Sequence, residues 1–181
     1  RASPSSARAS FGRDGGAPRL VIDIHCHVLP GIDDGPSGLD GTLDLARAAA
    51  DDGTTVLVAT PHVSYGFPND STVIGERVVR VNDALREVGI GLEVKGGAEV
   101  AHEMLPRLED DELRALTLGG GPNLLLEAPL AAVGGELEEA IERVHGIGLG
   151  VVLAHPERCP SFHRDPDRLA RLVAGGVATS V

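Results

Sequence analysis

Histidine and acidic residues stand at the ends of short apolar segments, a pattern that could build a metal site. His25 and His27 are separated by one residue at the end of the segment LVIDIHCHV. Because side chains alternate along a β-strand, two imidazoles at this spacing lie on the same side and can share a metal ion. The same alternation turns Cys26 the other way, which predicts a small core residue and not a thiolate ligand.

Five further candidates lie farther along the chain. They are Asp34, His62, Glu99, Glu127 and His155. Imidazole together with carboxylate suits manganese, zinc or iron. Glu127 lies within the apolar run LLLEAP, where an unpaired carboxylate is costly to bury, so a cation is the simpler partner. An isolated HxH pair is more often an ordinary surface or core feature. The metal hypothesis therefore rests on the whole set.

Alternating strand and helix patterns position these residues. Apolar segments with β-strand character cover residues 20–28, 54–62, 91–100, 123–129, 150–158 and 176–181. Helical periodicity lies between them, over residues 39–52, 74–88, 137–146 and 166–174. Ser37 is the expected N-cap of the first of these helices, and Asp165 that of the last. Such alternation predicts an α/β fold with a parallel sheet covered by helices.

Six of the seven candidates, all except Asp34, fall at or just after the carboxyl ends of predicted strands. In a barrel these ends converge on one mouth, where active sites are built from several strands. An open doubly wound sheet would set them in a row, which makes convergence of five strands harder. The sequence therefore favours a barrel, formed by one domain over residues 20–181.

Composition narrows the function classes. The chain has 181 residues, 42% of them hydrophobic, which suits one domain with a sizeable core. Its formal net charge is −11 without a basic block, which argues against nucleic acid as a partner. No apolar run approaches the roughly 18 residues of a membrane span. Residues 1–19 lack the apolar core of a secretory signal and are predicted to be a disordered leader. The two cysteines, too few for a disulfide framework, suit a reducing cytoplasm.

Five linked motifs carry a resemblance to a known family. In order along the chain they are DIHCHVLPGIDDG, ATPH, GAEV, LLLEAP and AHPER. Together they resemble the PHP (polymerase and histidinol phosphatase) superfamily. Within it they are most similar to the manganese-dependent tyrosine-protein phosphatases of bacterial capsule and exopolysaccharide operons. The resemblance implies a distorted TIM-like barrel of the (β/α)7 type that holds three metal ions, most simply manganese.

The resemblance also implies individual roles. One metal would be held by His25, His27 and Glu99; Glu99 would bridge to a second, held by Glu127 and His155; Asp34 and His62 would bind a third. Arg158 would contact the phosphate, a role that its planar fork of donors suits. The family completes its cluster with an Asp-x-His pair after a later strand. We therefore expect this chain to be truncated before its last ligands, which would leave the barrel incomplete.

The implied activity is hydrolysis of phosphotyrosine on proteins, with a bacterial tyrosine kinase as the expected substrate. Neither cysteine is followed by arginine at the CxxxxxR spacing of thiolate phosphatases, so metal-assisted attack by water is favoured. Two alternatives stay open. One is a phosphatase for a small metabolite such as histidinol phosphate, because metal ligands do not determine the leaving group. The other is a catalytically impaired remnant that binds metal or a partner. Oligomeric state is not readable from the sequence.

Overall fold

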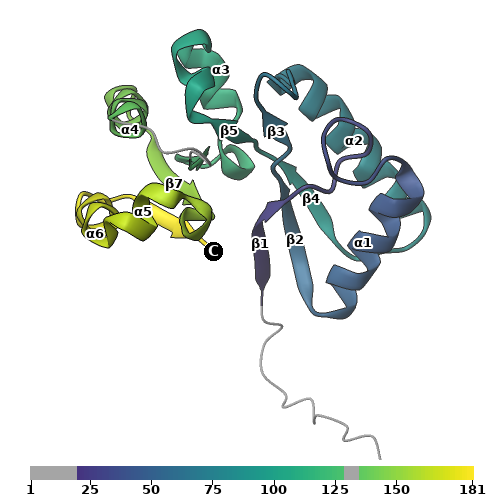
Figure 1. Ribbon diagram of the computed structural model, residues 1–181. Helices are drawn as coiled ribbons and strands as arrows, with labels where there is room; N and C mark the ends of the chain where they lie inside the picture. Colours follow the sequence, from purple (N-terminus) through teal and green to yellow (C-terminus); the bar gives the residue numbers. More distant parts are fainter. Residues whose placement is uncertain (1–19, 129–134) are drawn as a thin grey trace, which may run out of the picture.

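Two parallel β-sheets form the centre of the molecule (Figure 1). The computed structural model describes residues 20–128 and 135–181, so the predicted leader over residues 1–19 lies outside the described part. The first sheet has the order β1 (Val21–Cys26), β2 (Thr54–Ala59), β4 (Glu93–Gly96). The second has the order β3 (His62–Val63), β5 (Glu99–Ala101), β6 (Asn123–Glu127), β7 (Gly150–Ala154), β8 (Ala178–Ser180). Every pair of neighbouring strands is parallel, which confirms the predicted α/β class.

Two of the six predicted strands are each broken into two, which is a correction to the sequence prediction. The segment 54–62 divides into β2 and β3 at Pro61, which has no N–H for the ladder. The segment 91–100 divides into β4 and β5 at Gly97. A Cβ atom on Gly97 would lie 3.1 Å from the Val58 side chain and 3.3 Å from the Cα of Leu118, so the backbones approach closely at this bend. Both breaks pass the chain from one sheet to the other.

The order of the strands agrees with the predicted barrel, but the described strands do not close into one. When the broken strands are read through, neighbouring strands follow one another in sequence order across both sheets, unlike a doubly wound sheet. Within the described residues, however, β1 pairs only with β2 and β8 only with β7. The described chain therefore forms an open arc of strands and not a closed barrel.

The four predicted helices are confirmed. They are α1 (Leu39–Asp51), α2 (Ser71–Glu87), α4 (Glu136–Gly146) and α6 (Pro166–Ala174). The Asp165 side chain caps α6 as predicted, by accepting from the backbone N–H of Arg168. The predicted cap by Ser37 is wrong, because α1 begins one residue later and Gly38 is its N-cap. Short elements not predicted from the sequence are η1 (His102–Arg107), α3 (Asp110–Ala115), η2 (Leu118–Gly120), η3 (Pro156–Arg158) and α5 (Pro160–Arg164).

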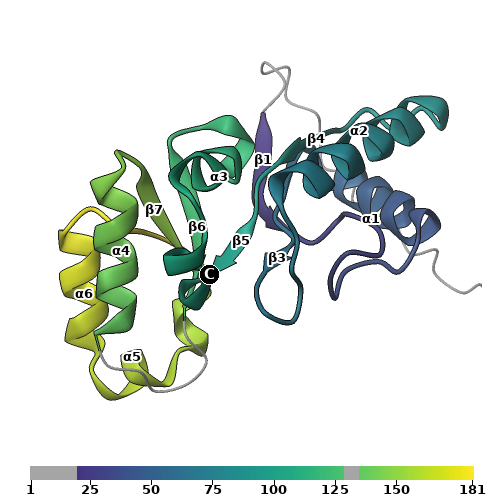
Figure 2. The same cartoon turned by 90° about the horizontal axis from the view of Figure 1, so that it is seen from above.

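Helices cover the outer side of the arc. Figures 1 and 2 show α1 and α2 beside the three-stranded sheet, and α4 beside β7 with α6 next to it. In β6, Leu124 and Leu126 join the main core, whereas Leu125 packs with Val152 and Ala154 in a separate small cluster. The second sheet is thus buried on both faces here, as parallel sheets usually are. Among the described residues, no helix is long and apolar enough to cross a membrane.

Candidate metal centre

Glu99 is the central residue of the candidate site. It begins β5, and its side chain is 1% exposed. Its Oε2 lies 3.1 Å from Nε2 of His27 and 3.3 Å from Nε2 of His25. The same oxygen is 3.4 Å from Nδ1 of His62, while Oε1 is 2.6 Å from Nε2 of His155. Four imidazoles from three different strand ends therefore surround one buried carboxylate.

The position of Glu99 follows from the two chain breaks. The backbone N–H of Glu99 donates to the carbonyl of Pro61 at 3.1 Å, directly before β3. Thr60 is fully buried at the first break, where its N–H donates to the carbonyl of Cys26 and its hydroxyl accepts from the Cys26 N–H at 3.0 Å. The carboxyl ends of β1 and β2 and the start of β5 are thereby held together, which brings their ligand candidates to one place.

His25 and His27 lie together as their spacing predicted, with ring centroids 5.7 Å apart. Cys26 between them is partly buried and packs against the main core, which matches its predicted role. Burial, followed by the negative charges of Asp23 and Asp33, raises the pKa of the Cys26 thiol to about 11. A thiol with such a pKa stays protonated near neutral pH and is neither a nucleophile nor a metal ligand.

The ligand atoms gather in three groups, each of which could hold a cation. The groups are His25 with Glu99 and His155, His27 with Asp34 and His62, and His62 with Glu99 and Glu127. All seven residues predicted as ligands are therefore brought together. The grouping differs from the assignment implied by the resemblance, since His155 is grouped with His25 and not with Glu127, and His27 is grouped with Asp34 and His62.

The pKa values of two carboxylates in the site, Glu99 and Glu127, are shifted in opposite directions. Burial alone would raise the pKa of Glu99, but hydrogen bonds from His25 and His27, together with the charges of His25 and His62, hold it well below its ordinary value. Burial raises the pKa of Glu127, and the negative charge of Glu99 adds to this, whereas His62 and His155 oppose it. Glu99 is thus ionised over the physiological range, as a metal-binding carboxylate must be.

His155 has a strained backbone. Its φ of 30° and ψ of 55° place it in the left-handed region, and it is the only residue other than glycine with a positive φ in the described chain. Such a conformation costs about 1–2 kcal/mol and persists at functional sites when the surroundings impose it. It directs Nε2 to Glu99, and its buried Nδ1 has no hydrogen-bond partner among the described residues.

His27 has a second poorly satisfied nitrogen. Its Nδ1 lies 2.9 Å from Asp33 and 3.1 Å from Asp34, but no described residue makes an aligned hydrogen bond to it. Burial alone would lower the pKa of His27, but the carboxylates of Asp33 and Glu99 outweigh it and raise the pKa to about 10. Buried imidazole nitrogens without aligned partners and ionised carboxylates form a donor set that fits divalent cations.

Asp33 is a site residue that the sequence analysis missed. Its side chain is fully buried, whereas that of its neighbour Asp34 is 63% exposed. Asp33 accepts hydrogen bonds from the backbone N–H groups of Gly35 and His62. Burial alone would raise its pKa, but the contact with His27 and these backbone bonds keep it lowered. The sequence shows the Asp-Asp pair but not which member faces inward.

Arg158 lies on η3, three residues after His155. Its side chain is exposed, and no other described residue makes a hydrogen bond or ion pair with that side chain. Its backbone N–H donates to the carbonyl of His155 at 2.9 Å. The predicted contact of Arg158 with a phosphate group stays a prediction.

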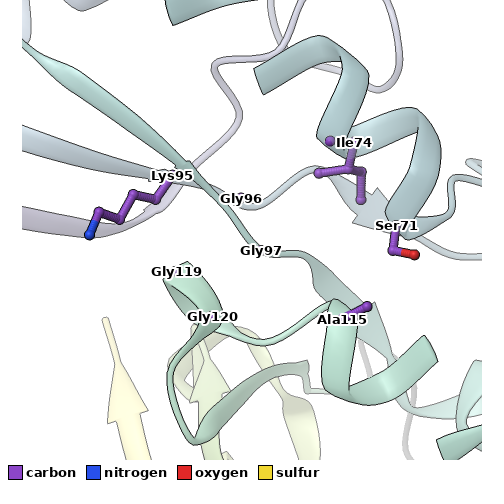
Figure 3. A pocket seen from close by; sticks show the side chains of 9 residues that line it. Ser71, Ile74, Lys95, Gly96, Gly97, Ala115, Gly119 and Gly120 are labelled. Atoms are coloured by element: carbon purple, nitrogen blue, oxygen red, sulfur yellow. The ribbon is translucent and has the colours of Figure 1, made fainter. Parts of the chain in front are cut away.

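A surface groove of about 400 Å³ lies apart from the metal centre (Figure 3). Figure 3 shows it bounded by Ser71 and Ile74 of α2 on one side and by Gly119 and Gly120 of η2 on the other, with Gly96 between them. None of the seven ligand candidates lines this groove. Its walls are largely glycine backbone, with no cluster of ligand side chains comparable with that around Glu99.

Known proteins are similar to this chain in sequence and in fold. The tyrosine-protein phosphatase YwqE of Bacillus subtilis is 32% identical over 164 residues, which are 89% of this chain and 64% of that protein. The tyrosine-protein phosphatase CpsB of Streptococcus pneumoniae is 26% identical over 89% of this chain and 67% of its own length. This chain therefore spans about two thirds of the length of these relatives.

A solved structure agrees with these matches. A crystal structure from work on YwqE and on CpsB of Streptococcus pneumoniae, described as unique metal-dependent tyrosine phosphatases, superimposes with a TM-score of 0.79 at 31% sequence identity. The match covers 88% of this chain and 65% of that one. The family model described as capsular polysaccharide synthesis, CpsB/CapC, matches residues 21–181. These matches confirm the family resemblance inferred from the motifs: the chain belongs to the CpsB/CapC family.

Proposed function

We propose that this chain carries the metal-binding part of a protein-tyrosine phosphatase that hydrolyses phosphotyrosine with the help of divalent cations. The observation that carries the proposal is the convergence of six histidine and carboxylate side chains with Glu99 into three groups of ligand atoms, with buried nitrogens of His27 and His155 lacking aligned partners. The tyrosine phosphatases YwqE and CpsB, to which the chain is similar, support the substrate class. The chain spans only part of those proteins, so the activity is put forward for testing.

The residues would divide the work as follows. The three groups of ligand atoms would each hold a cation, and Glu99, which belongs to two of them, would link these two. Such cations supply positive charge to the phosphoryl oxygens and lower the pKa of bound water. Arg158, exposed on η3, would neutralise a further phosphoryl oxygen with its guanidinium group. No thiolate takes part, because Cys26 is held protonated and Cys159 is buried.

Finer features of the proposal follow the PHP resemblance. We take residues 20–181 as a PHP metallophosphoesterase domain whose arc of strands belongs to a distorted TIM-like barrel. The metal would be manganese, the partner a bacterial tyrosine kinase, and the compartment the cytoplasm. The strand order supports the barrel, and the imidazole and carboxylate ligands are compatible with manganese.

The direct test is phosphate release from a phosphotyrosine peptide by the metal-loaded chain. We expect turnover with added manganese, loss of turnover with a chelator, and slower turnover of histidinol phosphate at equal concentration. Faster turnover of histidinol phosphate would favour a metabolite phosphatase instead. Absence of turnover with manganese, zinc and iron alike would overturn the proposed activity of this chain.

Two variants separate the metal centre from general effects. Glu99→Gln removes the charge that faces four imidazoles, so we expect loss of metal binding and at least a hundredfold loss of turnover. Glu93→Gln removes an exposed carboxylate at the start of β4 and should leave both unchanged. Cys26→Ser should also keep activity, because the thiol has no chemical role.

A further inference from the structure

Aromatic residues are rare in this chain, yet two of them lie in one loop beside the candidate metal centre. The sequence contains one tyrosine, three phenylalanines and no tryptophan. Tyr65 and Phe67 both follow β3, within five residues of the ligand candidate His62. Phe162, by contrast, is buried in the main core. Neither Tyr65 nor Phe67 belongs to the buried core, so both rings are available for something other than core packing.

The loop that carries them is held in shape. Ser64 and Phe67 exchange backbone hydrogen bonds of 3.0 and 3.2 Å, which close a tight turn with Tyr65 in it. The side-chain amide of Asn69 donates to the carbonyls of Ile32 and His62 at 2.9 and 2.8 Å. The turn is therefore anchored on two sides, and a ligand that binds to it has little ordering cost to overcome.

The two rings have different partners. The Phe67 ring stacks on the imidazole of His62, with centroids 5.6 Å apart and planes only 11° from parallel. Tyr65 is 59% exposed, and the guanidinium carbon of Arg107 lies 5.1 Å from its ring centroid. Arg107 ends η1, the segment that directly follows the strand carrying Glu99. The Tyr65 ring is therefore exposed to solvent, stabilised by a cation, and available to contact an aromatic ligand.

We propose that Phe67 and Tyr65, the latter held by Arg107, form a subsite for the aromatic ring of a phosphotyrosine side chain. The substrate class rests on the proposed function. With the phosphoryl group at the ligands around Glu99, a phenyl ring on the His62 side of the site would meet the aromatic loop at Phe67, which stacks on His62. A phosphoserine side chain has no ring to offer there.

The test compares binding of three probes to the manganese-loaded chain. They are a phosphotyrosine peptide, a phosphoserine peptide of the same sequence, and inorganic phosphate, each measured by calorimetry. For this measurement both peptides carry a non-hydrolysable phosphonate in place of the phosphate ester, so that turnover does not consume them. The wild type should prefer the phosphotyrosine peptide. Tyr65→Ala should reduce that preference roughly three- to tenfold, the range expected for one lost aromatic contact, and leave the affinity for inorganic phosphate unchanged.

Two control variants sharpen the result. Tyr65→Phe keeps the ring and should keep the preference. Val88→Ala shortens an exposed side chain at the far end of α2 and should change nothing. Equal peptide preference in Tyr65→Ala and wild type would overturn the subsite, and so would a wild type that binds both peptides equally.

Hydrolysis assays on the same samples keep the two proposals apart. A chain that prefers the phosphotyrosine peptide in binding, loses the preference in Tyr65→Ala, and releases no phosphate would support the subsite and overturn the proposed activity. A chain that hydrolyses phosphotyrosine with the same preference in Tyr65→Ala as in wild type would support the activity and overturn the subsite.

Discussion

The buried carboxylate of Asp33 accepts a hydrogen bond of 3.1 Å from the backbone N–H of His62, across 29 residues of sequence. Its other oxygen accepts from the N–H of Gly35 at 3.0 Å, and its Oδ2 lies 2.9 Å from the ring of His27. One side chain therefore joins the loop after β1 to β3 and contacts a ligand candidate on each. Asp33 is in a position to orient ligands, whereas the exposed Asp34 faces the cation group itself.

We expect Asp33→Asn to weaken manganese binding by about 10- to 100-fold, the range seen when residues behind metal ligands are altered. The amide removes the negative charge beside His27. It has one acceptor oxygen, so it can accept from only one of the N–H groups of Gly35 and His62. Titration calorimetry of the metal-free protein would measure the change. Asp44→Asn, an exposed carboxylate on α1, is the matched control. Equal manganese affinity in Asp33→Asn and wild type would exclude the positioning role.

The strained backbone of His155 should be visible in folding stability. Both His155→Ala and His155→Gly remove the imidazole, but only glycine adopts the left-handed conformation without steric cost. We expect the glycine variant to be more stable than the alanine variant by about 1 kcal/mol in the metal-free state. Urea unfolding of the two variants tests this. Equal stability would mean that the backbone at residue 155 is not held in this conformation.

Gly35 should tolerate no side chain. A Cβ atom there would lie 2.4 Å from the carbonyl oxygen of His27, so the loop that carries Asp33 would have to move. We expect Gly35→Ala to lower the free energy of unfolding by about 1–3 kcal/mol and to weaken metal binding as well. Gly75→Ala, inside α2 with open space around it, should instead stabilise the fold by about 0.5–1 kcal/mol. Thermal unfolding of both variants would show opposite shifts.

The ion pair between Glu138 of α4 and Arg168 of α6 should make stability depend on pH. Arg168 contacts both carboxylate oxygens, and this pairing holds the pKa of Glu138 below its ordinary value of 4.5. Because the folded-state pKa is lowered, the contribution is present above pH 4.5 and is lost as the pH falls through the folded-state pKa. Glu138 is partly exposed, so we expect Glu138→Gln to cost no more than about 1 kcal/mol at pH 7.

Unfolding of Glu138→Gln and wild type at pH 7 and pH 3 would measure that dependence. The difference in stability should shrink at the lower pH, because the wild-type carboxylate becomes protonated. Glu139→Gln, an exposed neighbour on the same helix, should match wild type at both values. A difference between Glu138→Gln and wild type that stays constant across this range would rule out an ionic contribution.

Local pattern was enough to predict several elements of the site. The alternation of side chains in a strand placed His25 and His27 on one side, and the structure brings their rings together. Apolar runs followed by polar residues located the carboxyl ends of the strands that carry Glu127 and precede His155, whereas Glu99 begins the short strand β5. These features depend on residues close in sequence, so periodicity and residue type suffice to predict them.

Other features depend on contacts between distant residues. The bend at Gly97 follows from the approach of Val58 and Leu118, which no local pattern reveals. The inward turn of Asp33 is set by the N–H of His62 and the ring of His27. The N-cap of α1 also differs from the prediction, since Ser37 carries a capping side chain but Gly38 occupies the N-cap position.

By itself, the amino-acid sequence determined which residues could bind metal, at which strand ends they stand, and to which family they belong. Only the tertiary structure decided how they are grouped around Glu99, which aspartate is buried, and that residue 155 is strained. The physical reason is that residue type and spacing act along the chain, whereas ligand geometry and burial arise where separate strands meet.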